Sequence, residues 1–322
     1  MELIISNTRG FCAGVVRALD TLEELLSEYG SPIYVRHEIV HNNIVVNSLT
    51  NRGVIFVDNI DEIPKGAVAM MSAHGVGKDV IRNAKSRHLQ LVDGTCPLVT
   101  KVHLQVAAES RNGCSIIVIG HRNHVEVEGI LGHFHSDGQS EINVVENEAE
   151  AKQVRPPVGG QLAYVTQTTL AADQTRKIIR ILKRRFPNII APHGSTICYA
   201  TQNRQDAVRE LAGICEIIIV VGAPHSSNSR RMAEVALEAG CASVLIEQAN
   251  DLDMDYIASH KTVGLTASAS APEYLVTATV DLISQHVANL KLTELGATED
   301  ISFRLPKELK TMIGVRHARQ KI

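Results

Sequence analysis

Tryptophan is absent from the 322-residue chain, and aromatic residues make up only 3% of it. Proteins that bind single-stranded nucleic acid stack its bases on aromatic side chains, which this sequence cannot supply in quantity. An excess of positive charge is also missing, because 32 Lys and Arg are balanced by 35 Asp and Glu. We therefore expect no general binding to nucleic acid or to a membrane surface.

Long apolar runs and a secretory leader are missing as well. No stretch of about eighteen apolar residues occurs, and the N-terminus, MELIISNTRGFCAGV, has no basic segment before an apolar run. The sequence also lacks a Gly-rich phosphate loop and a dinucleotide-binding fingerprint. We expect a cytoplasmic protein without a membrane span or a bound nucleotide. Its 44% hydrophobic residues suffice for a large core, and its length predicts two or three domains.

What the sequence does contain is an internal repeat. Segments that begin at Cys96 and Cys198 align without a gap. Each runs from a predicted helix start through an amphipathic stretch to an apolar strand, which ends at Gly120 or Gly222. A segment that begins at Cys12 follows the same course. The repeat therefore places one cysteine at the head of each of three helices.

Polar side chains follow the strands of the three segments at equivalent positions. The first strand of each segment is followed by His41, His124 or Ser226. A later apolar run of each segment ends in a hydroxyl- or His-rich tip, at 72–76, 166–169 or 266–270. Ligands gather at the carboxyl ends of strands in parallel α/β proteins. The repeat thus predicts three α/β domains that face one central point.

The expected boundaries follow from the cysteine spacing. We expect α/β domains at 1–95, 96–195 and 196–288 and a C-terminal tail at 289–322. The tail falls outside the repeat, and its strand-like ISFRL segment at 301–305 and its basic end could cover a domain edge or remain mobile. Its basic end is typical of a solvated face, so no catalytic role is expected there.

The six cysteines are too dispersed for the disulfide framework of a small secreted domain. Those beside or within apolar runs are expected in the core: Cys114, Cys215 and Cys241. Those that head helices in polar, Gly- or Pro-containing contexts are Cys12, Cys96 and Cys198, where a helix N-terminus favours the thiolate. Three thiolates leave one metal coordination position open, as in catalytic sites. The lack of close CxxC pairs favours an iron–sulfur cluster, although the spacing leaves zinc open.

A further set of side chains supplies hydrogen-bond donors for a multiply charged anion. These are His41, His74, His124, Thr168, Ser226, Ser227, Asn228 and Ser270. Each alone would be an ordinary surface or core residue, but eight of them at repeat-equivalent positions indicate a site. Glu126 is the carboxylate that stands out, because in a water-poor pocket it could act as a general acid.

Nine motifs spread over residues 9–272 carry a resemblance to a known family. They are RGFCAGV at 9–15, VHN at 40–42, SAHGV at 72–76, TCPLVTKVH at 95–103, VEVEG at 125–129, TQTTL at 166–170, ICYATQNRQ at 197–205, SSNS at 226–229 and SASAP at 268–272. In this order they resemble the motifs of the LytB (IspH) family of 4-hydroxy-3-methylbut-2-enyl diphosphate reductases.

The resemblance implies a trefoil of three pseudo-threefold-related α/β domains around one [4Fe-4S] cluster per chain. Its ligands would be Cys12, Cys96 and Cys198, with one iron open to the substrate hydroxyl. The residues implied to hold the diphosphate are His41, His74, His124, Ser226, Asn228 and Ser270, with Ser227 adjacent. Glu126 would relay a proton, helped by Thr168.

The implied reaction is a two-electron reductive dehydroxylation that yields isopentenyl and dimethylallyl diphosphate, the last step of the non-mevalonate (MEP) isoprenoid pathway. Electrons would come from a ferredoxin- or flavodoxin-like donor, since no flavin or nicotinamide motif is visible. Two alternatives remain open at this point. One is a hydratase or dehydratase that uses the open iron as a Lewis acid, and the other is a non-catalytic iron–sulfur sensor.

Three positions depart from the family pattern. Val125 stands where the family usually has Pro, Ser268 where it usually has Gly, and Gly94 where Ala is more usual. Proline restricts φ and glycine permits conformations that other residues resist. The first two changes are therefore expected to alter loop geometry near His124 and Ser270 without removing a ligand.

Overall fold

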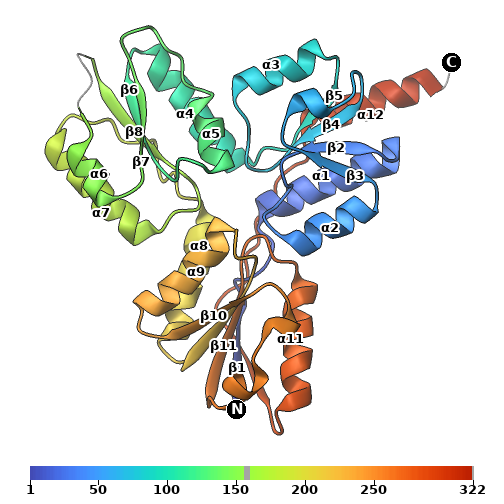
Figure 1. Cartoon of the computed structure of the whole chain (residues 1–322), viewed down its shortest axis with the longest axis vertical. Coiled ribbons are helices and arrows are strands. Elements are labelled where there is room, and N and C mark those ends of the chain that lie inside the picture. The colour runs from blue at the N-terminus through green and yellow to red at the C-terminus, as the bar shows by residue number, and fades with distance from the viewer. Residues whose placement is uncertain (156–159, 321–322) are drawn as a thin grey trace. The chain divides into compact units, whose positions relative to one another are not determined.

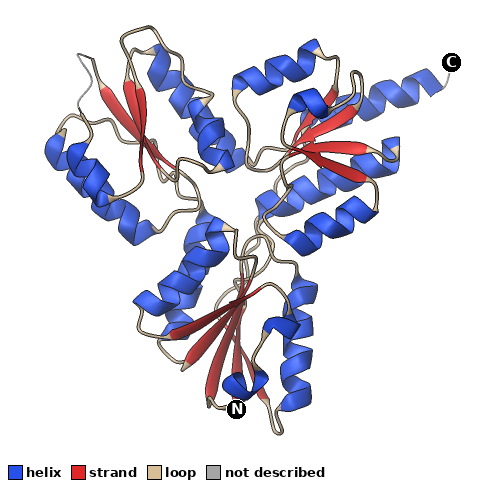
Figure 2. Cartoon of the chain, viewed as in Figure 1, coloured by secondary structure: helices blue, strands red, loops and turns tan. Residues whose placement is uncertain are grey.

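The computed structural model describes residues 1–155 and 160–320. It divides into two compact units. Unit 1 comprises Met1–Val15, Val40–Asn47 and Tyr199–Ser302, and unit 2 comprises Val16–Ile39, Ser48–Cys198 and the segment from Phe303 onward. The strands assigned within the described residues form three parallel sheets, one in unit 1 and two in unit 2 (Figure 2). The predicted α/β class with parallel sheets is confirmed.

Unit 1 is built on a five-stranded sheet in the order β10-β9-β11-β1-β12. Its strands are β1 (Glu2–Ser6), β9 (Ile217–Val221), β10 (Ala242–Ile246), β11 (Thr262–Ala267) and β12 (Lys291–Leu295). The N-terminal strand lies inside this sheet, with Leu3 level with Val263 of β11 and Leu292 of β12. Every residue of β9 is buried, as expected for a parallel strand covered on both faces.

Helices cover both faces of this sheet (Figure 1). They are α8 (Tyr199–Ala212), α9 (Ser227–Glu238), α10 (Met254–Ala258) and α11 (Glu273–His286), with a short 3-10 turn at Ala249–Asp251. Because side chains alternate along a strand, Ile218 and Val220 of β9 pack with the core under α8 and α9. Ile219 and its odd-numbered neighbours pack with Leu275 and Ile283 of α11 instead.

Unit 2 contains two smaller sheets. One has the order β3-β2-β4-β5, from β2 (Ile33–Arg36), β3 (Val54–Val57), β4 (Val68–Met71) and β5 (Gln90–Asp93). The other has the order β7-β6-β8, from β6 (Ser115–Ile119), β7 (Ile142–Val145) and β8 (Leu162–Thr166). The remaining elements of unit 2 are α3 (Lys78–Ser86), α4 (Pro97–Arg111), α5 (Val125–Leu131), α6 (Glu148–Gln153), α7 (Ala172–Arg185), α12 (Lys307–Gln320) and a 3-10 turn at Ile60–Glu62. Helices α1 (Ala13–Tyr29) and α2 (Asn43–Asn51) begin in unit 1 and continue in unit 2.

The expected strand at ISFRL, residues 301–305, is wrong. This segment forms no strand, and the carbonyl oxygen of Arg304 instead accepts a hydrogen bond of 2.8 Å from Nε of Arg17. The strand of the tail is β12, which lies earlier and pairs with β1. The trefoil arrangement and the expected domain boundaries remain predictions. Within the described ranges, no helix is long and apolar enough to cross a membrane.

Candidate active site

The three cysteines predicted as ligands all lie at helix starts, as expected. Cys12 directly precedes α1, Cys198 directly precedes α8, and Cys96 is the N-cap of α4, which has Pro97 in its first turn. All three are half-buried, whereas the cysteines expected in the core, Cys114, Cys215 and Cys241, are buried.

Each of the three cysteines is attached to a polar tip by the same kind of backbone hydrogen bond. The amide of Cys96 donates to the carbonyl oxygen of Ala73 at 3.0 Å, and the amide of Cys198 donates to that of Thr168 at 3.1 Å. The amide of Cys12 donates to Ala269 at 3.3 Å. Each cysteine is therefore bound to the tip of the preceding segment, and Cys12 to the tip of the last one.

Glu126 and Thr168 form a buried polar pair in unit 2. Glu126 is only 2% exposed. Its Oε1 accepts a 2.7 Å hydrogen bond from the amide of Thr168, and its Oε2 accepts a 2.9 Å bond from the Thr168 hydroxyl. Burial raises the pKa of Glu126 to about 7, although both bonds from Thr168 act in the opposite direction. The carboxyl group can therefore hold or release a proton near neutral pH.

Two histidines lie close to this pair. His124 is the N-cap of α5, and its Nδ1 accepts a 3.1 Å hydrogen bond from the amide of Glu126. Because Nδ1 is an acceptor, the uncharged ring carries its proton on Nε2, which is then a donor. The ring of His74 meets that of His124 edge-on, with centroids 6.2 Å apart. Nδ1 of His74 lies 3.3 Å from Oγ of Ser72.

Unit 1 assembles the remaining predicted donors around the N-terminus of α9. Ser226 is the N-cap, and its Oγ accepts hydrogen bonds of 3.4 Å from the amide of Ser229 and from Oγ of Ser270. Asn228 is 5% exposed, and its Oδ1 accepts a 2.9 Å bond from the amide of Ala269. Its Nδ2 finds no acceptor among the residues the structure describes. A buried donor without a partner, beside the positive end of a helix, suits an anion.

Ser268 adds another hydroxyl group to the donors around the N-terminus of α9. It is fully buried, and its Oγ lies 3.3 Å from Oγ of Ser270. A Cβ on Gly222 would come within 2.6 Å of Oγ of Ser268 and within 2.3 Å of Oγ of Ser229. Glycine at 222 therefore leaves room for the extra hydroxyl that replaces the usual glycine at 268.

His41 and its neighbours complete unit 1. The rings of His41 and His225 meet edge-on with centroids 5.8 Å apart. Asn42 is fully buried, its Nδ2 donates a 3.0 Å hydrogen bond to the carbonyl oxygen of Ser270, and its Oδ1 accepts a 3.1 Å bond from the amide of Val45. Sequence reasoning assigned no role to Asn42 or His225. In the sequence Asn42 follows His41 and His225 precedes Ser226, and this adjacency was the signal that could have indicated them.

The other two departures have clear settings. Val125 is the first residue of α5, a position that also suits proline, and His124 still caps the helix. A Cβ on Gly94 would lie 2.3 Å from the carbonyl oxygen of Met71 and 2.4 Å from Cε of Met70. A side chain at position 94 would therefore force the backbone of Met71 to shift.

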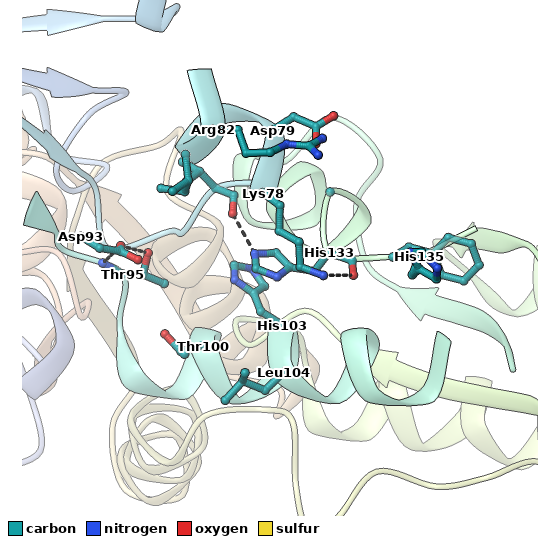
Figure 3. Close-up of a pocket in the computed structure, with 14 residues that line it drawn as sticks. Lys78, Asp79, Arg82, Asp93, Thr95, Thr100, His103, Leu104, His133 and His135 are labelled. Carbon is teal, nitrogen blue, oxygen red and sulfur yellow. Dashed lines mark hydrogen bonds and ion pairs between the residues drawn. The ribbon is translucent and has the colours of Figure 1, made fainter. Parts of the chain in front are cut away.

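The predicted residues thus fall into two connected sets. Unit 1 holds Cys12, His41, Ser226, Ser227, Asn228 and Ser270, and unit 2 holds His74, Cys96, His124, Glu126, Thr168 and Cys198. Unit 2 also contains a pocket of about 540 Å³ (Figure 3). It is lined by residues of α3 and α4, of the loops before these two helices and of the segment that follows α5, and by none of the predicted site residues.

The three parallel sheets define the class of parallel α/β proteins, in which ligands bind at the carboxyl ends of the strands. Within that class the chain belongs to the LytB family, since the family model described as LytB protein matches residues 3–284. Membership of this family implies an iron–sulfur cofactor.

Individual relatives agree over nearly the whole chain. A 4-hydroxy-3-methylbut-2-enyl diphosphate reductase of Saccharophagus degradans is 47% identical, with 96% of this chain and 100% of the relative covered. One of Haemophilus influenzae is 46% identical, with 96% and 98% covered.

Two solved structures are also similar. The E-1-hydroxy-2-methyl-but-2-enyl-4-diphosphate reductase from Plasmodium falciparum matches with a TM-score of 0.91 and 36% identity, covering 98% of each chain. A second reductase, described as the terminal enzyme of the non-mevalonate pathway, matches with a TM-score of 0.64 and 30% identity. This comparison covers 88% of this chain and 99% of the other.

Proposed function

We propose that this chain reduces 4-hydroxy-3-methylbut-2-enyl diphosphate to isopentenyl and dimethylallyl diphosphate, as the last step of the non-mevalonate pathway. Relatives named 4-hydroxy-3-methylbut-2-enyl diphosphate reductase are 44–47% identical over nearly the full chain. The observation that carries the proposal is the buried carboxyl of Glu126, bound at both oxygens by Thr168, whose carbonyl oxygen in turn binds the amide of Cys198. This chain of contacts connects a proton donor to a proposed metal ligand.

The cofactor of this proposal is one [4Fe-4S] cluster per chain, held by Cys12, Cys96 and Cys198. The donor set suits it, because all three are half-buried thiols at helix N-termini, and sulfur ligands select iron–sulfur clusters. When bound, such a cluster with three cysteine ligands supplies electrons and an open iron that polarises the substrate hydroxyl.

The diphosphate of the substrate is assigned to the imidazole, hydroxyl and amide donors. These are His41, His74, His124, Ser226, Ser227, Asn228 and Ser270. The unpartnered Nδ2 of Asn228 and the Nε2–H of His124 are both able to donate to phosphate oxygens. The first amides of α9 add the positive end of a helix of 12 residues.

Proton delivery is assigned to Glu126 and Thr168. The net reaction consumes two electrons and two protons, breaks the C–O bond of the substrate and releases water. With a pKa of about 7, Glu126 is substantially protonated at neutral pH and can donate one of these protons. The Thr168 hydroxyl donates to Oε2 of Glu126, and we assign to it the roles of orienting the carboxyl and contacting the substrate hydroxyl.

The electrons are proposed to come from a ferredoxin- or flavodoxin-like protein. Delivery from outside is required because the sequence contains no flavin or nicotinamide motif. Dependence of turnover on a reductant also separates this function from a dehydratase that uses iron only as a Lewis acid.

The experiment is anaerobic turnover of the hydroxylated diphosphate by reconstituted protein with reduced methyl viologen, with iron and sulfide measured in parallel. Both C5 diphosphates should form, and Glu126→Gln should lower kcat by roughly 10²- to 10⁴-fold with iron content unchanged. Glu128→Gln, on the exposed side of the same helix, is the matched control and should retain activity. A fully loaded wild-type protein that reduces nothing would contradict the proposal.

A further inference from the structure

His103 has no place in the site described so far, yet it is among the most buried polar residues of unit 2. It lies on α4 and is 4% exposed. Its ring stacks on that of His133, with centroids 4.1 Å apart and planes 18° from parallel (Figure 3). Its Nε2 has no hydrogen-bond partner in the described part of the chain. The ring is therefore held by packing rather than by hydrogen bonds at this nitrogen.

The ring of His103 fills a space that two glycines leave empty. A Cβ on Gly75 would come within 2.6 Å of Cε1 of His103, and Gly75 has a φ of +80°. A Cβ on Gly129 would lie 3.3 Å from Nε2 of His103 and 3.3 Å from the backbone of Gly75. The loop after β4 and the middle of α5 thus meet each other and His103 at one point.

His133 and its neighbours link the loop after β4 and the end of the α5 segment by hydrogen bonds. Nε2 of His133 donates a 3.0 Å hydrogen bond to the carbonyl oxygen of Val76, and Nζ of Lys78 donates a 3.2 Å bond to the carbonyl oxygen of His133. The amide of Lys78 donates at 3.2 Å to the carbonyl oxygen of Gly132. Figure 3 shows the two rings between these segments. The stack therefore lies inside a joint formed by residues 75–78 and 129–133.

This joint bears directly on two proposed diphosphate donors. His74 immediately precedes Gly75, and His124 caps the helix that contains Gly129. The two imidazoles come from segments associated with different sheets, so the joint determines how far apart they lie. Donors to a small rigid anion must keep their spacing, because a displaced donor loses its charge-assisted hydrogen bond and binding weakens.

We propose that His103, stacked on His133, is a positioning residue that sets the spacing of His74 and His124 for the diphosphate. The inference rests on the proposed function. Burial lowers the pKa of His103 to about 3 and also lowers that of His133, so both rings are uncharged near neutral pH and stack without repulsion. Neither ring needs to touch the substrate for this role.

The test compares His103→Ala, His133→Ala and His103→Gln, which keeps a flat side chain of similar volume. Two quantities are measured: KM and kcat with the reduced dye, and the Kd of inorganic pyrophosphate for cluster-loaded protein by calorimetry. We expect His103→Ala to raise KM and the pyrophosphate Kd by roughly tenfold, the effect of losing about one hydrogen bond to the anion, with kcat within about twofold and iron content unchanged. His133→Ala should act in the same direction, and His103→Gln should restore most of the affinity.

Ile178→Ala is the control for general destabilisation, since it opens a cavity in the core of the same unit. It should lower Tm without changing either KM or Kd. Pyrophosphate affinity unchanged in both His103→Ala and His133→Ala would overturn the inference while leaving the proposed function intact. If His103→Ala does not fold, His133→Ala, on a half-buried residue, decides alone. A wild-type protein that neither binds pyrophosphate nor reduces substrate would reject the proposed function itself.

Discussion

At the scale of single residues, the environment of Glu126 couples activity to stability. Burial removes the carboxyl group of Glu126 from solvent, and two hydrogen bonds from Thr168 do not fully compensate for the lost hydration of its charged form. The pKa of Glu126 is therefore raised from 4.5 to about 7 in the folded chain. Below pH 4.5 both folded and unfolded chains hold this proton. As the pH rises toward 7 the unfolded chain releases it first, so folding becomes less favourable.

This linkage predicts a stability difference between wild type and Glu126→Gln. Above pH 7 the cost of the wild-type carboxyl is constant and amounts to about 3 kcal/mol, which the uncharged amide avoids. Glu126→Gln should therefore gain Tm relative to wild type as pH rises from 5 to 8, while losing turnover. Thermal melts across this range measure it. A difference in Tm that does not change with pH would contradict the raised pKa.

Ser268 is a second residue whose effect is testable. Its hydroxyl lies 3.3 Å from that of Ser270, which donates to Ser226. Ser268→Gly removes the hydrogen bond that orients the Ser270 hydroxyl. It should therefore weaken pyrophosphate binding by roughly two- to fivefold. Thr266→Val is the matched control, because it removes a buried hydroxyl from the same tip that has no partner within the described chain. Equal affinity of the two variants would remove Ser268 from the site.

At the scale of elements, the cysteine-headed helices could be predicted because a cysteine, an amphipathic stretch and a terminal strand recur at one spacing. The strand β12 could not be predicted from the sequence. Its sequence, KLTEL, has little apolar character, and its residues are exposed or half-buried. It forms because a partner is present: β1 pairs along its length, and Glu2 accepts hydrogen bonds of 2.8 Å from both Lys291 and Thr293. A tertiary partner outweighed local propensity here.

The start of α4 yields a prediction at this scale. Gly94 makes its tight approach to Met71 in the turn that leads to Cys96, and its carbonyl oxygen accepts a 3.1 Å hydrogen bond from Arg17. Gly94→Ala, although it restores the residue usual in the family, should lower the unfolding free energy by about 1–3 kcal/mol, because the backbone of Met71 must shift. Denaturant unfolding measures it.

Gly213→Ala provides the comparison for that measurement. A Cβ at Gly213 would meet only ordinary contacts, at 3.5 Å or more. This variant should be close to wild type in stability. Equal stability of Gly94→Ala and Gly213→Ala would mean that the turn before Cys96 can relax at little cost.

At the scale of the whole molecule, the repeat predicted which side chains belong together but not how the segments exchange contacts. Cys12 is bound to Ala269 and not to the tip of its own segment at 72–76, which holds Cys96 instead. Nothing in the local sequence encodes this exchange, because it depends on β1 pairing with β11 across most of the chain. The side-chain partners of Asn228 and Glu126 likewise required the folded chain.

The three segments should contribute equally to iron binding if each cysteine is a ligand. Cys12→Ser, Cys96→Ser and Cys198→Ser are each expected to lose most iron and sulfide after reconstitution, because a three-cysteine cluster has no spare protein ligand. Cys114→Ser, Cys215→Ala and Cys241→Ala, on buried core residues, should keep a full complement. Iron and sulfide analysis measures both groups. Retention of the cluster in Cys12→Ser would contradict the proposed ligand set.

The interior position of β1 in its sheet has a consequence for biosynthesis. This strand lies between β11 and β12, so its neighbours in the sheet are residues 262–265 and 291–295. Chains emerge from the ribosome N-terminus first, at about 5–20 residues per second, so β1 waits unpaired until nearly all of the chain has been made. Cys12 depends on the same late contacts, since its amide binds Ala269. The first proposed ligand to be synthesised is thus the last to be fixed in place, so a metal centre held by all three proposed ligands would form only after translation.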